Sequence, residues 1–203
     1  VVVSSGRDKA IMSKWFGDLP VTLVAEHGVY VRKPSMPPGE WELHHTPLTH
    51  VPWKEKVREA MQQTVAVLPG TFVEEKEFGI VFHYRGAVQH EAADSVIKGL
   101  RGSLSSMISG MPLRIIGEKK AFEVAEATVN KGSYMAKFLQ QKGIPEFVLA
   151  VGDDVTDEDM FAAAPPGSYT IRVGNQISQA QYNLASFVQV RALLAKFLPR
   201  LPF

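Results

Sequence analysis

Five acidic residues occupy seven consecutive positions directly after a short apolar run: Asp153, Asp154, Asp157, Glu158 and Asp159. The apolar run is rich in β-branched residues and ends at Gly152, so it predicts a buried strand, a tight turn and then a helix. In an open α/β sheet, ligands lie beyond the carboxyl ends of the strands, which is where Asp153 and Asp154 are expected. Two carboxylates with no Lys or Arg beside them in the sequence favour a hard divalent cation such as Mg²⁺.

Helix capping is an alternative interpretation of these acidic residues. The segment from Thr156 to Asp159 has the form of a capping box, and acidic residues in a first turn interact favourably with the helix dipole. Capping explains that segment but leaves Asp153 and Asp154 without a role. A calcium-binding EF-hand loop is disfavoured, because the glycine that its sharp turn requires is absent.

Two further segments contain residue types that suit the binding of an anion. A predicted strand over 1–3 is followed by Ser5, Gly6 and Arg7 and then by a predicted helix. A turn in this position presents a hydroxyl and backbone N–H groups to a ligand, although a Ser-Gly turn can also be purely structural. Lys131 stands at the start of another predicted helix, where a cation opposes the helix dipole, so its amine is expected to face a bound anion.

The composition is that of an ordinary globular protein. Of the 203 residues, 45% are hydrophobic and 21% are charged, and the formal net charge is +1. This length allows a sizeable core, and the near-neutral charge provides no basic field for nucleic acid or for an anionic membrane. The sequence has no cysteine, which excludes disulfides and agrees with a cytoplasmic location. No apolar run approaches the roughly 20 residues of a membrane span, and the first residues do not resemble a signal peptide.

The apolar periodicity predicts a core in which strands and helices alternate. Strands are predicted at 1–3, 21–25, 29–32, 148–151 and 169–173, and helices at 9–16, 131–143 and 188–198. Residues 180–186 are predicted to form a loop. The histidines at 44, 45 and 50 lack a helical spacing and lie among Thr and Pro, so they are interpreted as solvated loop residues rather than metal ligands.

A second pattern, α-β-β-α-β-β, interrupts this core. It consists of a helix over 52–67, a hairpin over 71–77 and 80–85, a helix over 89–108 and a hairpin over 113–116 and 121–124. This order describes a small sheet with two helices covering one side. We therefore expect an α/β core formed by residues 1–47 and 128–203, with an inserted α/β cap formed by residues 48–127.

Three motifs in this order resemble those of the haloacid-dehalogenase-like phosphatases: Ser-Gly after the first strand, Lys-Gly at a helix start, and the acidic segment over 152–161. The acidic segment is long enough to resemble the trehalose-6-phosphate phosphatases in particular, including the C-terminal domains of trehalose-phosphate synthases. The cap sequences at 73–76, 83–85 and 122–124, and the Ala-Glu-His-Gly at 25–28, are similar to the same family. The resemblance spans nearly the whole chain and implies a Rossmann-like core with an inserted cap.

The resemblance also implies roles for individual residues. Ser5 is expected to hydrogen-bond the transferring phosphoryl group, Lys131 to neutralise its charge, and Asp153 to bind Mg²⁺ with the support of Asp154 and Asp157. In the cap, the residues expected to bind the sugar hydroxyls of trehalose 6-phosphate are Glu74, Lys76 and Glu123. Gly6 and Arg7 are expected to contact the substrate as well, and His27 to lie near the boundary between cap and core.

The implied function is the Mg²⁺-dependent hydrolysis of trehalose 6-phosphate to trehalose and phosphate, in a domain that is fused to or associated with a trehalose-phosphate synthase. One departure from the family is clear, because the Asp-x-Asp-Gly-Thr motif that supplies the nucleophile and the general acid is absent. Since Val1 already lies in a predicted strand, we expect that motif and the central strand to precede Val1, which leaves two sheet edges unpaired. The alternatives are a catalytically inactive regulatory or sugar-phosphate-binding domain, and a phosphatase for another sugar phosphate such as sucrose 6-phosphate. The complete set of cap residues favours an active enzyme.

Overall fold

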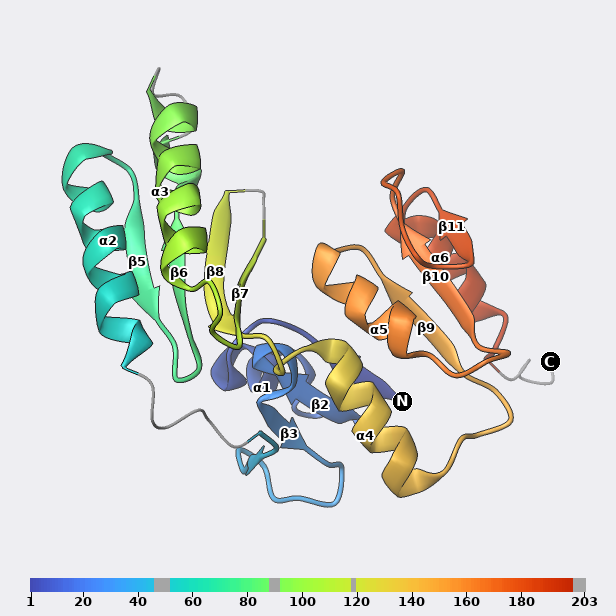
Figure 1. The fold of residues 1–203 in the computed structure, drawn as a ribbon. Helices are drawn as coiled ribbons and strands as arrows, with labels where there is room; N and C mark the ends of the chain where they lie inside the picture. The colour runs from blue at the N-terminus through green and yellow to red at the C-terminus, as the bar shows by residue number, and fades with distance from the viewer. Residues whose placement is uncertain (46–51, 88–91, 118–119, 199–203) are drawn as a thin grey trace. The chain divides into compact units, whose positions relative to one another are not determined.

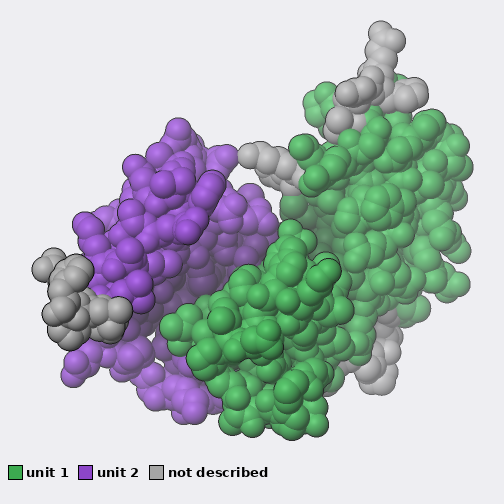
Figure 2. All heavy atoms as spheres, turned by 180° about the vertical axis from the view of Figure 1, so that it is seen from behind, with its two compact units in different colours: residues 1–129 green, residues 130–203 purple. Residues whose placement is uncertain are grey.

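The computed structural model describes residues 1–45, 52–87, 92–117 and 120–198 (Figure 1). The chain divides into two compact units, unit 1 with residues 1–129 and unit 2 with residues 130–203, which are distinguished by colour in Figure 2. The finer division into two core segments and a cap, 1–47, 48–127 and 128–203, stays a prediction. Among the described residues, no helix is both long and apolar enough to cross a membrane.

The first sheet of unit 1 has four strands in the order β1-β2-β3-β4, in which β1 and β2 are parallel and the other pairs antiparallel. Its elements are β1 (Val2–Ser4), α1 (Lys9–Phe16), β2 (Thr22–Ala25), β3 (Tyr30–Arg32) and β4 (Glu42–Leu43). Asp8 caps the N-terminus of α1, since its carboxylate accepts a hydrogen bond from the backbone N–H of Ile11 at 2.8 Å. Met12 of α1 is fully buried and packs with Leu23 and Tyr30 of the sheet.

The second sheet of unit 1 has four antiparallel strands in the order β5-β6-β8-β7. Its elements are α2 (Trp53–Val67), β5 (Phe72–Glu75), β6 (Gly79–His83), α3 (Ala93–Met107), β7 (Leu113–Ile116) and β8 (Ala121–Glu126). Figure 1 shows α2 and α3 side by side against this sheet, as the α-β-β-α-β-β pattern predicts. The residues that α2 buries recur every three or four positions, which places them on one face: Trp53, Val57, Met61 and Thr64.

Alternation along the strands of the second sheet divides its side chains between two faces. Ile80 and Phe82 of β6, with Phe122 and Val124 of β8, belong to the apolar cluster that includes residues of α2 and α3. The intervening residues point to the opposite face, which no helix of that cluster covers. On this opposite face Val81 is buried, whereas the polar side chains of Glu74, His83 and Glu123 keep some exposure to solvent.

Unit 2 contains a three-stranded parallel sheet in the order β11-β10-β9. Its elements are α4 (Lys131–Lys142), β9 (Leu149–Gly152), α5 (Glu158–Ala163), β10 (Tyr169–Val173), β11 (Tyr182–Leu184) and α6 (Phe187–Ala195). A short 3₁₀ turn over Val155–Asp157 joins β9 to α5, and α4 packs against α5. The predicted succession of strand, tight turn and helix around the acidic residues is confirmed.

The sequence interpretation is wrong for residues 180–186, for the burial of the first strand and for His45. Residues 182–184 form an edge strand rather than a loop, because they pair in parallel with β10. The first strand is not buried over 1–3, since Val1 is 96% exposed and Val2 is 37% exposed. His45 is a half-buried residue rather than a solvated one, with its Nε2 2.7 Å from Oε2 of the buried Glu126. The prediction for His50 lies outside the described residues.

Candidate functional site

The acidic residues of unit 2 form a compact turn that is held by its own side chains. The backbone N–H of Asp154 donates to Oδ2 of Asp157 at 2.8 Å, and the N–H of Val155 donates to Oδ1 of Asp154 at 2.7 Å. The contact between Asp154 and Asp157 is part of a capping box, in which the Asp154 side chain also accepts from the backbone N–H of Asp157. The capping alternative placed this box at Thr156 and Asp159, so its register is wrong, although capping itself is present. Thr156 and Asp157 are buried, while Asp153 and Asp154 are exposed.

Lys131 meets the acidic turn from the first residue of α4. Its Nζ donates to Oδ1 of Asp157 at 2.7 Å, and the side chains of Lys131 and Asp157 are only 8% and 7% exposed. The ammonium faces an anion, as its position at a helix start predicts, but the anion within the chain is Asp157. An ammonium has three N–H donors, so the contact with Asp157 leaves donors for a second anionic partner.

Two glycines allow this close arrangement. A Cβ on Gly152 would lie 2.2 Å from Cγ of Asp157, and a Cβ on Gly132 would lie 2.1 Å from the backbone oxygen of Asp159. The first contact explains why the β-branched strand has to end in a glycine where the acidic turn folds back. The second explains the Lys-Gly sequence at the start of α4.

Arg172 of β10 supports the turn from the neighbouring strand. Its Nη1 donates to the backbone oxygen of Asp154 at 2.7 Å and to Oε1 of Glu158 at 3.1 Å. Arg172 is 4% exposed, so these are buried, charge-assisted hydrogen bonds of the stronger kind. Sequence reasoning missed this residue, because the 18 positions between Asp154 and Arg172 give no local signal of contact.

Asp153 is the carboxylate of the turn best suited to bind a cation. It is exposed, and among the described residues no hydrogen bond or ion pair to its side chain is found. Both oxygens of Asp157 already accept hydrogen bonds, from Lys131 and from Asp154. The described residues contain no group of three or more His, Cys, Asp or Glu side chains that could hold a metal. A cation that keeps several waters and takes one or two protein carboxylates, as Mg²⁺ does, fits this donor set better than one that needs a full protein cage.

The Ser5-Gly6-Arg7 loop of unit 1 is held by backbone contacts with β2 and with the turn after it. The N–H of Ser5 donates to the oxygen of Val24, and the N–H of His27 donates to the oxygen of Ser5, at 2.9 and 3.0 Å. The Ser5 hydroxyl accepts a hydrogen bond from the N–H of Arg7 at 3.2 Å. The Arg7 guanidinium lies 4.6 Å from the centre of the Trp15 ring, which places it over an aromatic face.

His27 packs against Gly6 from a strained turn. Glu26 and His27 have φ values of 49° and 60°, in the left-handed region that side chains other than glycine rarely occupy. This turn places the His27 ring where a Cβ on Gly6 would lie, only 2.4 Å from two ring atoms. Strain of this kind is retained where the surrounding structure fixes it, and it is common next to functional sites.

Three of the predicted substrate residues meet within unit 1. Nζ of Lys76, beyond the end of β5, donates to Oε2 of Glu123 at 3.0 Å and to the backbone oxygen of Gly6 at 3.2 Å. Nε2 of His27 lies 3.9 Å from the same oxygen of Glu123. Lys76 and Glu123 are 14% and 13% exposed, so the pair is largely removed from solvent. The hairpin of β5 and β6 thus contacts the loop after β1 through Lys76.

The turn that contains Lys76 is fixed on both sides. Nζ of Lys54 in α2 donates to the backbone oxygens of Lys76 and Glu77, both at 2.6 Å, and burial lowers the pKa of Lys54 despite the nearby carboxylate of Glu75. The Tyr30 hydroxyl donates to the Glu77 carboxylate. Phe78 is 3% exposed and belongs to the apolar cluster of the first sheet. The position of Lys76 is therefore determined by contacts with α2, β3 and the first core cluster.

Glu26 lines a small cavity beside this lysine. The cavity has a volume of about 10 Å³, which is close to the room that one water needs. Its lining includes Glu26, His27, Phe78 and Glu123. Burial raises the pKa of Glu26, and the positive charges of Lys76 and Lys9 only partly oppose this effect.

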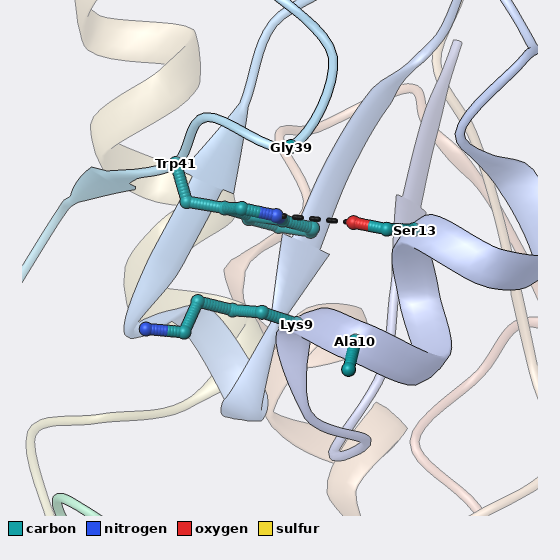
Figure 3. Close-up of a pocket in the computed structure, with 5 residues that line it drawn as sticks. All are labelled: Lys9, Ala10, Ser13, Gly39 and Trp41. Atoms are coloured by element: carbon teal, nitrogen blue, oxygen red, sulfur yellow. Dashed lines mark hydrogen bonds between the residues drawn. The ribbon is translucent and has the colours of Figure 1, made fainter.

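A larger hollow of about 430 Å³ lies beside α1. Figure 3 shows its lining, with the Trp41 indole N–H directed to the Ser13 hydroxyl at 3.2 Å. Nζ of Lys9, whose side chain also lines the hollow, lies 3.5 Å from the centre of the Tyr30 ring. None of the residues predicted to act in binding or catalysis lines this hollow.

Glu74 makes a contact that sequence reasoning did not identify. Its Oε2 lies 2.6 Å from Nε2 of His83 on the neighbouring strand, and the His83 ring stacks on Phe72. Glu74 pairs with Val81, and Val81 and His83 are two positions apart on the same strand, so Glu74 and His83 lie diagonally on one face of the hairpin. The structure therefore brings together Gly6, Lys76 and Glu123 in unit 1, and Lys131, Asp154 and Asp157 in unit 2.

Comparison with known proteins assigns the fold to the haloacid-dehalogenase-like class. The chain superimposes on a haloacid-dehalogenase-like hydrolase from B. subtilis with a TM-score of 0.61 at 15% identity, over 98% of this chain and 87% of that chain. The sequence matches the trehalose-phosphatase family over residues 1–188, so the chain belongs to that family.

Individual relatives agree with this family assignment. The C-terminal domain of the C. albicans trehalose-6-phosphate phosphatase superimposes with a TM-score of 0.84 at 26% identity, over 97% of this chain and 78% of that chain. A bifunctional trehalose-6-phosphate synthase/phosphatase of Thermoproteus tenax is 38% identical over 199 residues, which are 98% of this chain. The chain spans only 26% of the length of that relative. The predictions of the family, and of an α/β fold of the haloacid-dehalogenase-like class with a cap, are confirmed.

Proposed function

We propose that the protein hydrolyses trehalose 6-phosphate to trehalose and phosphate in a Mg²⁺-dependent reaction. The observation that supports this most directly is the contact of Lys76 with both Glu123 of the second sheet and the Gly6 carbonyl of the loop after β1. The ammonium of Lys76, whose side chain is 14% exposed, joins a carboxylate suited to sugar hydroxyls to a loop suited to a phosphoryl group. Family membership supports the choice of trehalose 6-phosphate as the substrate.

In this proposal, the chain's own residues bind and neutralise the phosphate monoester. The Ser5 hydroxyl and the backbone N–H group of Gly6 donate hydrogen bonds to phosphoryl oxygens, while the N–H of Arg7 orients the Ser5 hydroxyl. Lys131 contributes its remaining N–H donors and its positive charge, while Asp157 holds the ammonium in place. Phosphoryl transfer depends mainly on positioning and on charge neutralisation, which these groups supply.

Asp153 is the proposed principal ligand of Mg²⁺, supported by Asp154 and Asp157. When bound, the ion neutralises charge on the phosphoryl group and orients it for in-line displacement. Asp157 acts by fixing the turn and Lys131, since both of its oxygens are engaged. Asp154 acts by capping the 3₁₀ turn that follows Asp153. The 203 residues contain no Asp-x-Asp-Gly-Thr segment, so the nucleophile is not assigned to any of them.

The test is phosphate release by the full-length protein with trehalose 6-phosphate as substrate, with Mg²⁺ present and after chelation. We expect turnover that stops on chelation, and much lower activity with sucrose 6-phosphate and glucose 6-phosphate. Replacing Asp153 by Asn should reduce kcat by at least about a hundredfold, because a neutral amide is a weaker ligand for the cation. Glu146→Gln, an exposed carboxylate in the loop before β9, is the matched control and should be unaffected.

The results also separate the alternatives. Binding of trehalose 6-phosphate without any hydrolysis by the full-length protein would indicate a sugar-phosphate-binding or regulatory domain. Faster hydrolysis of sucrose 6-phosphate would identify the other sugar phosphate as the substrate. We further propose that the domain is joined to a trehalose-phosphate synthase, because the bifunctional relative of Thermoproteus tenax is far longer than this chain. A cytoplasmic location belongs to the same proposal.

A further inference from the structure

The face of the second sheet that turns away from α2 and α3 presents its residues in ordered rows. Glu74, Val81 and Glu123 form one row across β5, β6 and β8, because Glu74 pairs with Val81 and Val81 pairs with Glu123. Phe72 and His83 form the adjacent row, together with Ala121 of β8. Neighbouring strands lie about 4.8 Å apart, so the backbones at Glu74 and Glu123 are separated by roughly twice that distance, with Val81 between them.

Small residues keep the first row open toward the loop after β1. Gly79 pairs with Ala125, and a Cβ on Gly79 would lie 2.2 Å from Oε1 of Glu123. The Glu123 carboxylate therefore folds over Gly79 toward Lys76, where the Lys76 ammonium holds it at 3.0 Å. This end of the face is the one that meets Gly6.

The Phe72 and His83 row forms the opposite end of the face. The two rings stack with their centres 4.3 Å apart and their planes inclined by only 10°. The side chain of His83 is 28% exposed and Phe72 is 56% exposed, so the stacked pair remains accessible at the surface. A rise of about 3.4 Å per residue places Phe72 roughly 13 to 14 Å along the chain from Lys76.

His83 also orients a predicted sugar ligand. Its Nε2 lies 2.6 Å from Oε2 of Glu74, while the Phe72 ring restricts the imidazole to one plane. His83 holds one oxygen of Glu74. Because the Glu74 side chain is 43% exposed, its carboxylate still reaches solvent. A carboxylate fixed in this way accepts hydrogen bonds from hydroxyl groups with little further loss of side-chain entropy.

We propose that Phe72 and His83 form a further sugar subsite, at the end of this face that lies away from the phosphate. It takes the terminal ring of a disaccharide phosphate, with Phe72 against the apolar face of that ring and His83 holding Glu74 toward its hydroxyls. The subsite is continuous with the Glu74 and Glu123 row, whose charged oxygens suit the same hydroxyl-rich ligand. A monosaccharide phosphate bound at Gly6 and Lys76 does not extend to this row, so the pair selects for disaccharide phosphates. This inference rests on the proposed function and specifies its substrate class.

The test is equilibrium binding of trehalose 6-phosphate and glucose 6-phosphate to the full-length protein by titration calorimetry, with Mg²⁺ chelated so that the substrate is not hydrolysed during the titration. Replacing Phe72 by Ala should weaken trehalose 6-phosphate binding about threefold to tenfold, the range for loss of one aromatic contact, with no change for glucose 6-phosphate. His83→Ala should weaken it about tenfold, because the Glu74 carboxylate loses its partner. His83→Gln, which retains an N–H donor for Glu74, should recover part of that loss.

The controls distinguish a defect of this subsite from a defect of folding or of the proposed function. Val67→Ala removes a 69% exposed apolar side chain from the end of α2 and should leave both affinities unchanged. Unchanged trehalose 6-phosphate binding in the Phe72 and His83 variants would overturn the subsite alone, as would equal losses for both ligands. Wild-type protein that binds no trehalose 6-phosphate at all would overturn the proposed function, and the subsite with it.

Discussion

Replacing Asp157 by asparagine removes the negative charge that faces Lys131 inside unit 2. The two side chains are 7% and 8% exposed and their charged atoms are 2.7 Å apart. At an effective dielectric constant of 20, the attraction between unit charges at this distance is about 6 kcal/mol, which desolvation offsets in large part. Removing one partner of a buried pair usually costs about 3–5 kcal/mol, because the remaining charge is left without compensation. We therefore expect Asp157→Asn to lower the free energy of unfolding by that amount.

Urea unfolding and a double-mutant cycle measure this effect. For a chain of this size, 3–5 kcal/mol corresponds to a fall in Tm of roughly 6–20 °C. Adding Lys131→Met to Asp157→Asn removes the uncompensated ammonium, while the amide oxygen can still accept the hydrogen bond from Asp154. The double variant should thus be more stable than the sum of the two single changes, with a coupling free energy of about 2 kcal/mol or more. Additive losses would refute the assignment of Asp157 as the buried counter-ion of Lys131.

Three other predictions concern single positions. Gly152→Ala should destabilise the protein by several kcal/mol, because the new Cβ overlaps Asp157. Gly99→Ala, at an open position of α3, should instead stabilise the protein by up to about 1 kcal/mol. Thermal unfolding of the two variants measures both effects. Burial raises the pKa of Tyr134 to about 12, so the folded state keeps its phenol proton while the unfolded state loses it. Stability should fall as the pH rises from 10 toward 12, and less so in Tyr134→Phe; a wild type and variant with parallel pH profiles would contradict this. Because the pKa of Glu26 is raised in the folded state, the contribution of Glu26 to stability is fully present below pH 4.5 and declines as the pH rises through the folded-state pKa. Glu26→Gln should therefore gain stability relative to wild type as the pH increases above 4.5. Urea midpoints at several pH values measure the difference.

Local patterns in the sequence were sufficient for most of the elements. The helix over 9–16 and the strand over 169–173 have the predicted bounds, since an N-cap aspartate and a β-branched run are local signals. The edge strand β11 was not predicted, because three residues are too short for a pattern and its pairing partner lies 11 positions away. The bounds of α6 are 187–195 rather than 188–198, an error at the helix ends.

The candidate site was predictable by residue type but not by partner. The motifs indicated Lys131 and the acidic turn, yet the contact between Lys131 and Asp157 joins residues 26 positions apart and depends on two glycines that leave room for it. The clamp of Lys54 on the turn at Lys76 was also missed, because its acceptors are backbone oxygens, which have no residue signature. Long-range packing decides such contacts.

In the described part of the chain, β1 lies at the end of the first sheet of unit 1, and β9 lies at the end of the sheet of unit 2. Each of the two strands pairs in parallel with its one neighbour in its own sheet. One side of each strand has N–H and C=O groups with no ladder partner there, and neither strand contains a proline or a lysine to block pairing. Such a side accepts an added strand from any chain that can supply one in parallel. Preparations of this 203-residue stretch alone should therefore be prone to strand exchange between copies at high concentration, and a short peptide that occupies either edge would be the natural means of keeping them monomeric.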